Sequence, residues 1–134
     1  MDMGKTMIVA GIGCRKGVAA TAVIAAVDAA LAEYRRERAE LSRLATGAAK
    51  RDETAIVIAA GMLGVPLHYV GEEALAEVAP LLSTHSEKSA EATGSPSLSE
   101  ASALAVAGEN GALLGPRVVA GQVTCALAEM ELLP

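Results

Sequence analysis

The sequence predicts an α/β protein: a three-layer α/β/α sandwich around a mostly parallel, mixed sheet of about five strands. Short apolar runs alternate with helical stretches along the chain, which is typical of layered α/β domains. The 134 residues suffice for one hydrophobic core but not for two. We therefore expect residues 1–134 to form a single domain.

The first half of the chain alternates strand and helix. A β-branched apolar run predicts a strand over Thr6–Ala10, which ends at the glycine-punctuated turn Gly11–Gly17. Apolar residues at helical spacing then predict a helix over Val18–Arg38. A second strand is expected over Leu41–Thr46. A second helix is expected over Asp52–Gly64, with acids in its first turn and glycine at its end.

The middle of the chain continues the alternation and then changes composition. A third short strand is predicted over Pro66–Val70, followed by a helix over Glu72–Ala79 that Pro80 ends. The stretch Leu82–Ser99 is rich in Ser, Thr, Glu, Gly and Pro. It predicts a surface loop, with residues 87–97 as its flexible part.

The last part predicts one helix and two strands. Ser97 and Glu100 have the spacing of a capping box, which opens a helix that runs to Ala107 and stops at Gly108. Two strands are expected to complete the sheet, one over Ala112–Leu114 and one over Val118–Leu127. A turn at Gly115-Pro116 separates them. A hairpin at this end of the chain would make the sheet mixed.

Composition disfavours several classes of function. Phe and Trp are absent and Tyr occurs twice, so stacking platforms for single-stranded nucleic acid are lacking. The net charge of −5 gives no basic footprint for a duplex. The nearly uncharged stretch Gly17–Ala32 is too short for a membrane span. We expect a cytoplasmic protein with neither a nucleic-acid nor a membrane partner, as a monomer or a homodimer.

The turn after the first strand is the best candidate for an anion site. Gly11, Gly13 and Gly17 let a ligand approach the backbone, and Arg15 and Lys16 add two positive charges before a helix N-terminus. Residues 1–51 carry nine basic and five acidic side chains, whereas residues 52–134 carry two and eleven. Dinucleotide and phosphate-loop motifs fit poorly. The alternative is a tight strand-to-helix turn with exposed cations.

Catalytic residues are not identifiable, and the candidates are weak. Cys14 lies beside two cations, a setting that lowers a thiol pKa, but a buried structural thiol is the alternative. His85 falls in the polar loop, and capping alone explains Glu100. Cys125, in an apolar strand, is expected to pack in the core. The two histidines have no metal-ligand spacing, so we predict no metal and no cofactor.

The segment Gly11-Ile12-Gly13-Cys14-Arg15-Lys16-Gly17 resembles the N-terminal signature of the CobE/CbiG C-terminal domain family of cobalamin biosynthesis. The similarity extends over nearly the whole chain. The further matching segments are Leu44–Thr46 with Lys50 and Glu53, Leu63–Leu67, the Ser/Thr-rich Ser83–Ser86, Ser97–Leu104 and Thr124–Ala128. The chain departs from the pattern in its longer segment 87–97 and in Arg117, where many relatives have Lys.

The resemblance implies an α/β/α sandwich that acts on corrin-ring precursors. In two-domain relatives, which open a δ-lactone on a cobalt-precorrin, this domain follows an N-terminal region. We expect this chain to correspond to the stand-alone form of the oxygen-dependent pathway. Precorrins carry a rim of acetate and propionate carboxylates, so the anion site fits them. The expected ligand-binding residues are Gly11, Gly13, Cys14, Arg15, Lys16, Gly17, Thr46, Ser83, Thr84, Ser86, Ser99 and Glu100.

Three functions stay open from the sequence. The first is a carrier or accessory protein that binds a precorrin or a hydrogenobyrinic-acid-type tetrapyrrole and passes it to other cobalamin-pathway enzymes. The second is a precorrin lactone hydrolase-like enzyme that uses Cys14, His85 or Glu100. The third is an unrelated nucleotide-binding α/β domain. The missing N-terminal region and the lack of a clear nucleophile–base pair favour the first.

Overall fold

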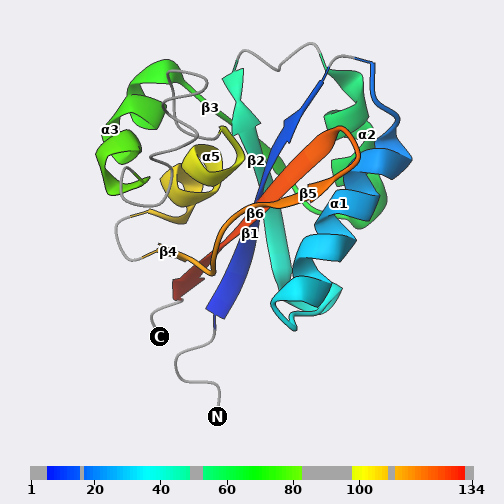
Figure 1. Cartoon of the computed structure of the whole chain (residues 1–134), viewed down its shortest axis with the longest axis horizontal. Helices are drawn as coiled ribbons and strands as arrows, with labels where there is room; N and C mark the ends of the chain where they lie inside the picture. Colours follow the sequence, from blue (N-terminus) through cyan, green and yellow to red (C-terminus); the bar gives the residue numbers. More distant parts are fainter. Residues whose placement is uncertain (1–5, 16, 49–52, 83–97, 109–110, 132–134) are drawn as a thin grey trace.

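The computed structural model describes residues 6–15, 17–48, 53–82, 98–108 and 111–131 (Figure 1). These residues form a six-stranded sheet with helices on both faces. In Figure 1, α1 and α2 lie to the right of the sheet and α3 and α5 to its left. The predicted three-layer α/β/α class is therefore confirmed.

The sheet has the order β3-β2-β1-β6-β4, and β5 also pairs with β6. Its strands are β1 (Thr6–Cys14), β2 (Leu41–Gly47), β3 (Leu67–Val70), β4 (Ala112–Leu113), β5 (Val118–Ala120) and β6 (Val123–Glu131). The pairings β1–β2 and β2–β3 are parallel, whereas β6 is antiparallel to β1, β4 and β5. The sheet is mixed and mostly parallel in strand direction, as predicted, because β1 to β5 all run the same way and β6 runs opposite to them. Strands joined by a short hairpin turn must run antiparallel.

The helices follow the predicted order with shifted ends. They are α1 (Ala20–Glu33), the 3₁₀ helix η1 (Arg38–Glu40), α2 (Thr54–Leu63), α3 (Glu72–Leu82) and α5 (Leu98–Ala107). Helix α1 ends earlier than predicted because Arg35 adopts a positive φ of 58°. Gly64 ends α2 in the left-handed conformation, as predicted.

Two further helix predictions need correction. Pro80 lies inside α3 and does not end it. A proline in the last turn removes one intrahelical hydrogen bond, and the residue four positions earlier, Ala76, is exposed to solvent that can satisfy its carbonyl. The first turn of α2 contains no acid, since Glu53 is its N-cap residue. Asp52 and the expected cap Ser97 lie outside the described residues, as does the loop segment 87–97.

The predicted strand over Val118–Leu127 is a hairpin in the structure. Ala120 pairs with Val123, so Gly121 and Gln122 form a two-residue turn in which Gly121 has a φ of 62°. Glycine at the first central position is typical of a type II′ hairpin turn. The segment Gly115-Pro116 does not reverse the chain. It interrupts an edge strand, because β4 and β5 pair with successive parts of β6.

The glycine segment after Ala10 also differs from the prediction. Residues Gly11–Cys14 continue strand β1 because each pairs with a residue of β6, from Gly11 with Ala126 to Cys14 with Val123. The turn toward α1 therefore begins only at Arg15. As a result, the first part of the predicted turn belongs to the sheet surface.

The two faces of the sheet have cores of different bulk. The face under α1 and α2 is filled by large side chains that include Ile8, Ile12, Leu44, Ile56 and Leu127. Under α5 the core is built mainly from small residues, namely Val9, Ala45, Ala103, Ala107 and Ala128. Helix α5 therefore lies close to the strands. In the described part of the chain, no helix is both long enough and apolar enough to cross a bilayer.

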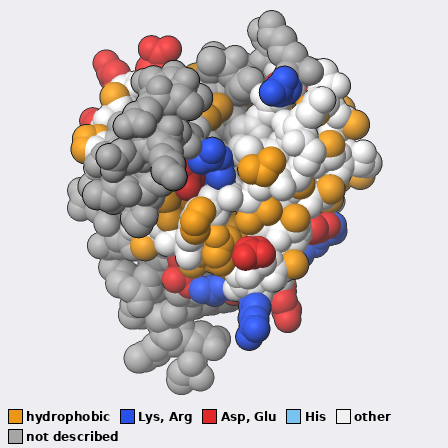
Figure 2. All heavy atoms as spheres, in the orientation of Figure 1, with side chains coloured by type: hydrophobic (Ala, Val, Ile, Leu, Met, Phe, Trp, Pro, Cys, Tyr) orange, Lys and Arg blue, Asp and Glu red, His pale blue; other side chains and the backbone are white. Residues whose placement is uncertain are grey.

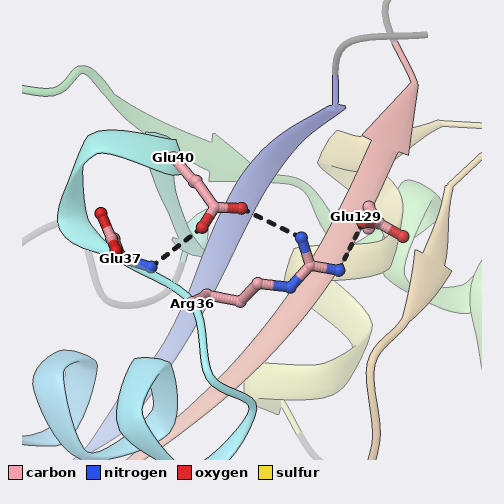
Figure 3. Close-up of polar contacts among 4 residues, drawn as sticks. All are labelled: Arg36, Glu37, Glu40 and Glu129. Carbon is pink, nitrogen blue, oxygen red and sulfur yellow. Dashed lines mark hydrogen bonds and ion pairs between the residues drawn. The ribbon is translucent and has the colours of Figure 1, made fainter.

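An ionic cluster joins the segment after α1 to the central strand β6 (Figure 3). Arg36 donates to Glu40 at 3.0 Å and to Glu129 at 2.6 Å. Glu40 also accepts the Glu37 backbone N–H at 3.0 Å. The Glu37 backbone N–H, and then the Arg36 guanidinium, lower the pKa of Glu40 below its usual value of 4.5. The charged form of Glu40 is thus favoured in the folded state.

Glu40→Gln is expected to lower the free energy of unfolding by about 1 kcal/mol at pH 7, since it removes charge-assisted bonds at a partly exposed site. Because the folded-state pKa of Glu40 is lowered, its contribution to the free energy of unfolding is fully present above the unfolded-state pKa. The contribution is lost as the pH falls through the lowered pKa. Urea denaturation at pH 7 and pH 3 measures this contribution, with Glu77→Gln, at an exposed position of α3, as control. An equal effect of Glu40→Gln at both pH values would contradict it.

Candidate functional site

Helix α5 approaches β1 at a glycine that leaves no room for a side chain. A Cβ on Gly11 would lie 2.0 Å from the carbonyl oxygen of Ser99 and 2.8 Å from the backbone nitrogen of Ala103. This close approach fixes the first turn of α5 beside the carboxyl end of β1 and leaves Ser99 fully buried. Gly11 therefore accommodates α5, and the expectation that it lets a ligand approach was wrong.

A groove of about 440 Å³ opens beside this contact, at the carboxyl end of β1. In Figure 2 a hollow in the upper half of the molecule is bordered by basic and hydrophobic side chains. Residues of β1, the start of α5 and the β5–β6 hairpin line the groove: Gly13, Cys14, Arg15, Leu98, Val119, Gly121, Gln122 and Thr124. This is the place where open α/β sheets bind ligands.

Backbone and side-chain hydrogen bonds tie β1 and the turn after it to the β5–β6 hairpin at the groove. The Arg15 backbone N–H donates to the carbonyl of Gln122 at 3.3 Å, which ties the turn after β1 to the hairpin tip. The hydroxyl of Thr124 donates to the carbonyl of Gly13, also at 3.3 Å. The Arg15 side chain is exposed at the groove. The guanidinium can therefore meet a carboxylate on a ligand without disturbing the bonds that hold the groove together.

The expected anion site at the start of α1 is differently arranged. The Gly17 N–H donates to Oε2 of Glu53 at 3.1 Å, so a carboxylate of this chain already occupies that donor. Helix α1 begins at Ala20, and its N-cap residue Ala19 provides no side-chain cap. Lys16 lies outside the described residues. Arg15 is therefore the predicted cation that the structure places at the groove.

Glu100 has a structural role that the sequence only partly indicated. Its carboxyl is nearly buried, at 4% exposure, and accepts the Arg117 backbone N–H at 3.2 Å. The Arg117 guanidinium lies 3.7 Å from the other carboxyl oxygen. On the neighbouring residue, the Pro116 carbonyl accepts the Tyr34 hydroxyl at 2.6 Å. Glu100 and Tyr34 thus anchor the interruption between β4 and β5.

The predicted binding residues divide into three groups. Gly13, Cys14 and Arg15 line the groove. Thr46, Ser99 and Glu100 are buried, and the Thr46 hydroxyl donates to the Ile12 carbonyl at 2.8 Å, so the structure gives Thr46 a role inside the sheet. Gly11, which lies under α5, and Gly17, whose N–H donates to Glu53, are likewise not among the lining residues of the groove. The third group lies outside the described residues: Lys16, Ser83, Thr84 and Ser86, together with the catalytic candidate His85.

Sequence reasoning did not identify five of the eight residues that line the groove. The missed lining residues are Leu98, Val119, Gly121, Gln122 and Thr124. Gly121 followed by Gln122 between two β-branched runs is a hairpin signal that could have indicated the turn. The position of that turn beside Cys14 follows only from the antiparallel pairing of β1 with β6.

The two thiols differ in environment. Cys125 is fully buried, and burial raises its pKa to about 12. Cys14 is partly buried at the groove. The expectation that Cys125 packs in the core is confirmed. Among the described residues, no three His, Cys, Asp or Glu side chains are grouped to hold a metal ion.

The profile of the family described as cobalamin synthesis G C-terminus matches residues 8–128, which include the groove and all six strands except the ends of β1 and β6. The chain belongs to this family. It is a protein of cobalamin biosynthesis. The resemblance that the sequence motifs indicated is confirmed.

Individual members of the cobalamin synthesis G C-terminus family are similar over most of their length. Protein CobE from Sinorhizobium sp is 32% identical over 121 residues, which cover 90% of this chain and 79% of that protein. The crystal structure of CobE, a protein from the cobalamin (vitamin B12) biosynthetic pathway, matches with a TM-score of 0.82 and 34% identity, and the match covers 93% of this chain and 94% of that one.

Two further solved structures are similar to this chain, and the second of them is a much longer chain. Cobalamin biosynthesis protein ChiG from Agrobacterium tumefaciens str. C58 is 46% identical with a TM-score of 0.74, over 91% of this chain and 97% of that one. A protein described as a cobalamin biosynthesis protein G homologue, from Sulfolobus solfataricus, shares the fold at 24% identity and a TM-score of 0.70. That match covers 93% of this chain but 37% of the longer one.

Gly11→Ala is expected to lower the free energy of unfolding by about 3 kcal/mol, because the new methyl group meets backbone atoms of α5 that cannot rotate away. Chemical denaturation measures the change. The control is Gly61→Ala on the exposed face of α2, where a Cβ meets nothing within 4 Å. The control is expected to be neutral or stabilising by up to about 1 kcal/mol. Equal stabilities of the two variants would contradict the described α5–β1 contact.

The thiols are expected to differ in reactivity. Iodoacetamide at pH 8 should alkylate Cys14 in the native protein and spare Cys125, because the Cys125 thiol is buried and its pKa of about 12 leaves almost no thiolate. Peptide mass spectrometry with and without urea gives the modified fractions. Alkylation of Cys125 at the same rate in native and unfolded protein would show that β6 is not buried as described.

Proposed function

We propose that this chain binds a precorrin-type tetrapyrrole in the groove at the carboxyl end of β1, as a carrier or accessory protein for ring-modifying enzymes of cobalamin biosynthesis. The observation that carries the proposal is the groove of about 440 Å³ with Arg15 at its border and apolar walls. Sites for large organic ligands are concave and mostly apolar, with a small number of placed polar groups. We also propose that residues 1–134 act as one domain, in the cytoplasm.

Charge complementarity supports this ligand class. A precorrin carries acetate and propionate groups around an apolar ring, so its receptor needs a cation beside an apolar surface. Arg15 supplies a guanidinium that can bind a carboxylate in bidentate fashion. The chain as a whole carries a net charge of −5. A local cation at the groove therefore has to attract the anionic ligand against the field of the whole protein.

The described residues favour binding over catalysis. Cys14 lines the groove, but His68, the histidine within the described ranges, lies on β3, which is two strands away from β1. A thiol nucleophile is normally activated by a base within hydrogen-bond reach. The carboxyl of Glu100 is engaged by Arg117. The lactone hydrolase-like alternative therefore has less support than the carrier.

A titration followed by visible absorbance tests the proposal with hydrogenobyrinic acid as the probe. The chain has two Tyr and no Trp or Phe, so the protein does not obscure the pigment spectrum. A saturable band shift with unchanged pigment mass on release supports a carrier. A changed mass would replace the carrier by an enzyme. Absence of any shift, together with binding of a nucleotide, would overturn tetrapyrrole binding.

Arg15→Gln is expected to weaken hydrogenobyrinic acid binding at least about tenfold, because a charge-assisted contact to a carboxylate is lost. Added salt should weaken wild-type binding more than binding by the variant. The matched control is Arg35→Gln, an exposed arginine beyond the far end of α1, about 20 Å away along the helix. Equal affinities of the two variants would remove Arg15 from the site.

A further inference from the structure

Val119 is unusually placed for a valine. It is 63% exposed, slightly more than Met62 and clearly more than Val57 and Ile58, the other exposed large apolar side chains in the described part of the chain. Its neighbours on β5, Val118 and Ala120, pack against the core on the α1 side of the sheet. Because side chains alternate along a strand, Val119 points to the opposite face, where it lines the groove. An apolar side chain presented to an open groove suits contact with a ligand.

Leu98 lines the other side of the same groove. It lies at the first residue of α5, and its side chain packs over the end of β2, where a Cβ on Gly47 would meet it at 2.8 Å. The strand order places β1 and β6 between β2 and β5. Three strand spacings therefore separate the two sides, which is about 14 Å.

Between Leu98 and Val119, the surface of the sheet carries small side chains that do not rise into the groove. Gly13 on β1 pairs with Thr124 on β6, and both line the groove. Gly13 adds no side chain, and a Cβ there would lie 2.8 Å from the Thr124 hydroxyl. The result is a floor of small residues bordered by Leu98 and Val119. This floor can receive a broad ring that a narrower slot would exclude.

We propose that Leu98 and Val119 are apolar walls that contact the periphery of the ring and select a tetrapyrrole macrocycle over other polyanions. The inference rests on the proposed function and assigns ring selection to these walls and carboxylate binding to Arg15. The walls are fixed before the ligand binds. Pairing with β6 through the two-residue turn at Gly121 fixes the position of β5. The hydrogen bond from the Arg15 N–H to the Gln122 carbonyl fixes the tip of this hairpin. Preformed walls lose little entropy on binding.

Val119→Thr tests the walls because it keeps the β-branched shape and replaces one methyl group by a hydroxyl. It should weaken hydrogenobyrinic acid binding roughly fivefold to tenfold, through lost apolar contact and the desolvation of the hydroxyl. The salt dependence of binding should stay as in the wild type, in contrast to Arg15→Gln. The matched control is Val57→Thr on the exposed face of α2, which should bind as the wild type does.

The outcomes separate this inference from the proposed function. The wild type could bind the pigment while Val119→Thr binds it as tightly as Val57→Thr. In that case the role of Val119 in ring selection is overturned and the proposed function stands. If the wild type binds no pigment, the proposed function fails and the walls fail with it. Citrate, a small tricarboxylate without a ring, serves as the selectivity probe. Val119→Thr should leave citrate binding unchanged, and an equal loss for both ligands would contradict ring selection.

Discussion

The approach of α5 to β1 at Gly11 is the constraint on which the candidate site depends. Since a Cβ at this position would overlap the Ser99 carbonyl, the helix can lie against the strand only over glycine. The small residues beneath the rest of α5, such as Ala45 and Ala128, extend the same close contact. This packing gives an alanine-rich chain without Phe or Trp a second core on that face of the sheet. It also sets Leu98 at the border of the groove.

The opposite border depends on the edge of the sheet. Tyr34 and Glu100 hold Pro116 and Arg117, the segment that interrupts the edge strand. After this interruption, β5 pairs with β6 and reverses at Gly121. The groove therefore lies between a helix fixed by close packing and a hairpin fixed by hydrogen bonds. Both borders are parts of the folded structure, which is why we assign this site a preformed shape.

Local pattern predicted the elements better than their partners. The alternation of strands and helices, the glycine end of α2 and the extent of α5 to Ala107 follow from periodicity and capping residues near each element. The continuation of β1 through Gly11–Cys14 depends on β6, more than 100 residues later in the chain. No local signal carries that pairing. The glycines were accordingly assigned to a ligand turn, when Gly11 is required by a helix.

The same contrast between local pattern and distant pairing separates the site residues that were predicted from those that were not. Arg15 and Cys14 lie at a strand end, where position along the chain predicts position in the site. Thr46 lies in the adjacent parallel strand, but its hydroxyl bonds to the Ile12 carbonyl within the sheet, and sequence alone does not tell which way a strand residue bonds. Val119 and Gln122 enter the site only because the last two strands form a hairpin. The polar residues 83–86 lie outside the described part of the chain.

The central claim is that the groove between α5 and the β5–β6 hairpin holds the tetrapyrrole. The most direct measurement is an NMR titration of ¹⁵N-labelled protein with hydrogenobyrinic acid, since a conjugated ring shifts the signals of nearby amides. We expect the amide signals of Arg15, Gly121 and Gln122 to shift most and those of α2 to stay unchanged. Largest shifts on the exposed face of α2, at Val57 and Met62, would place the pigment elsewhere and contradict binding in the groove.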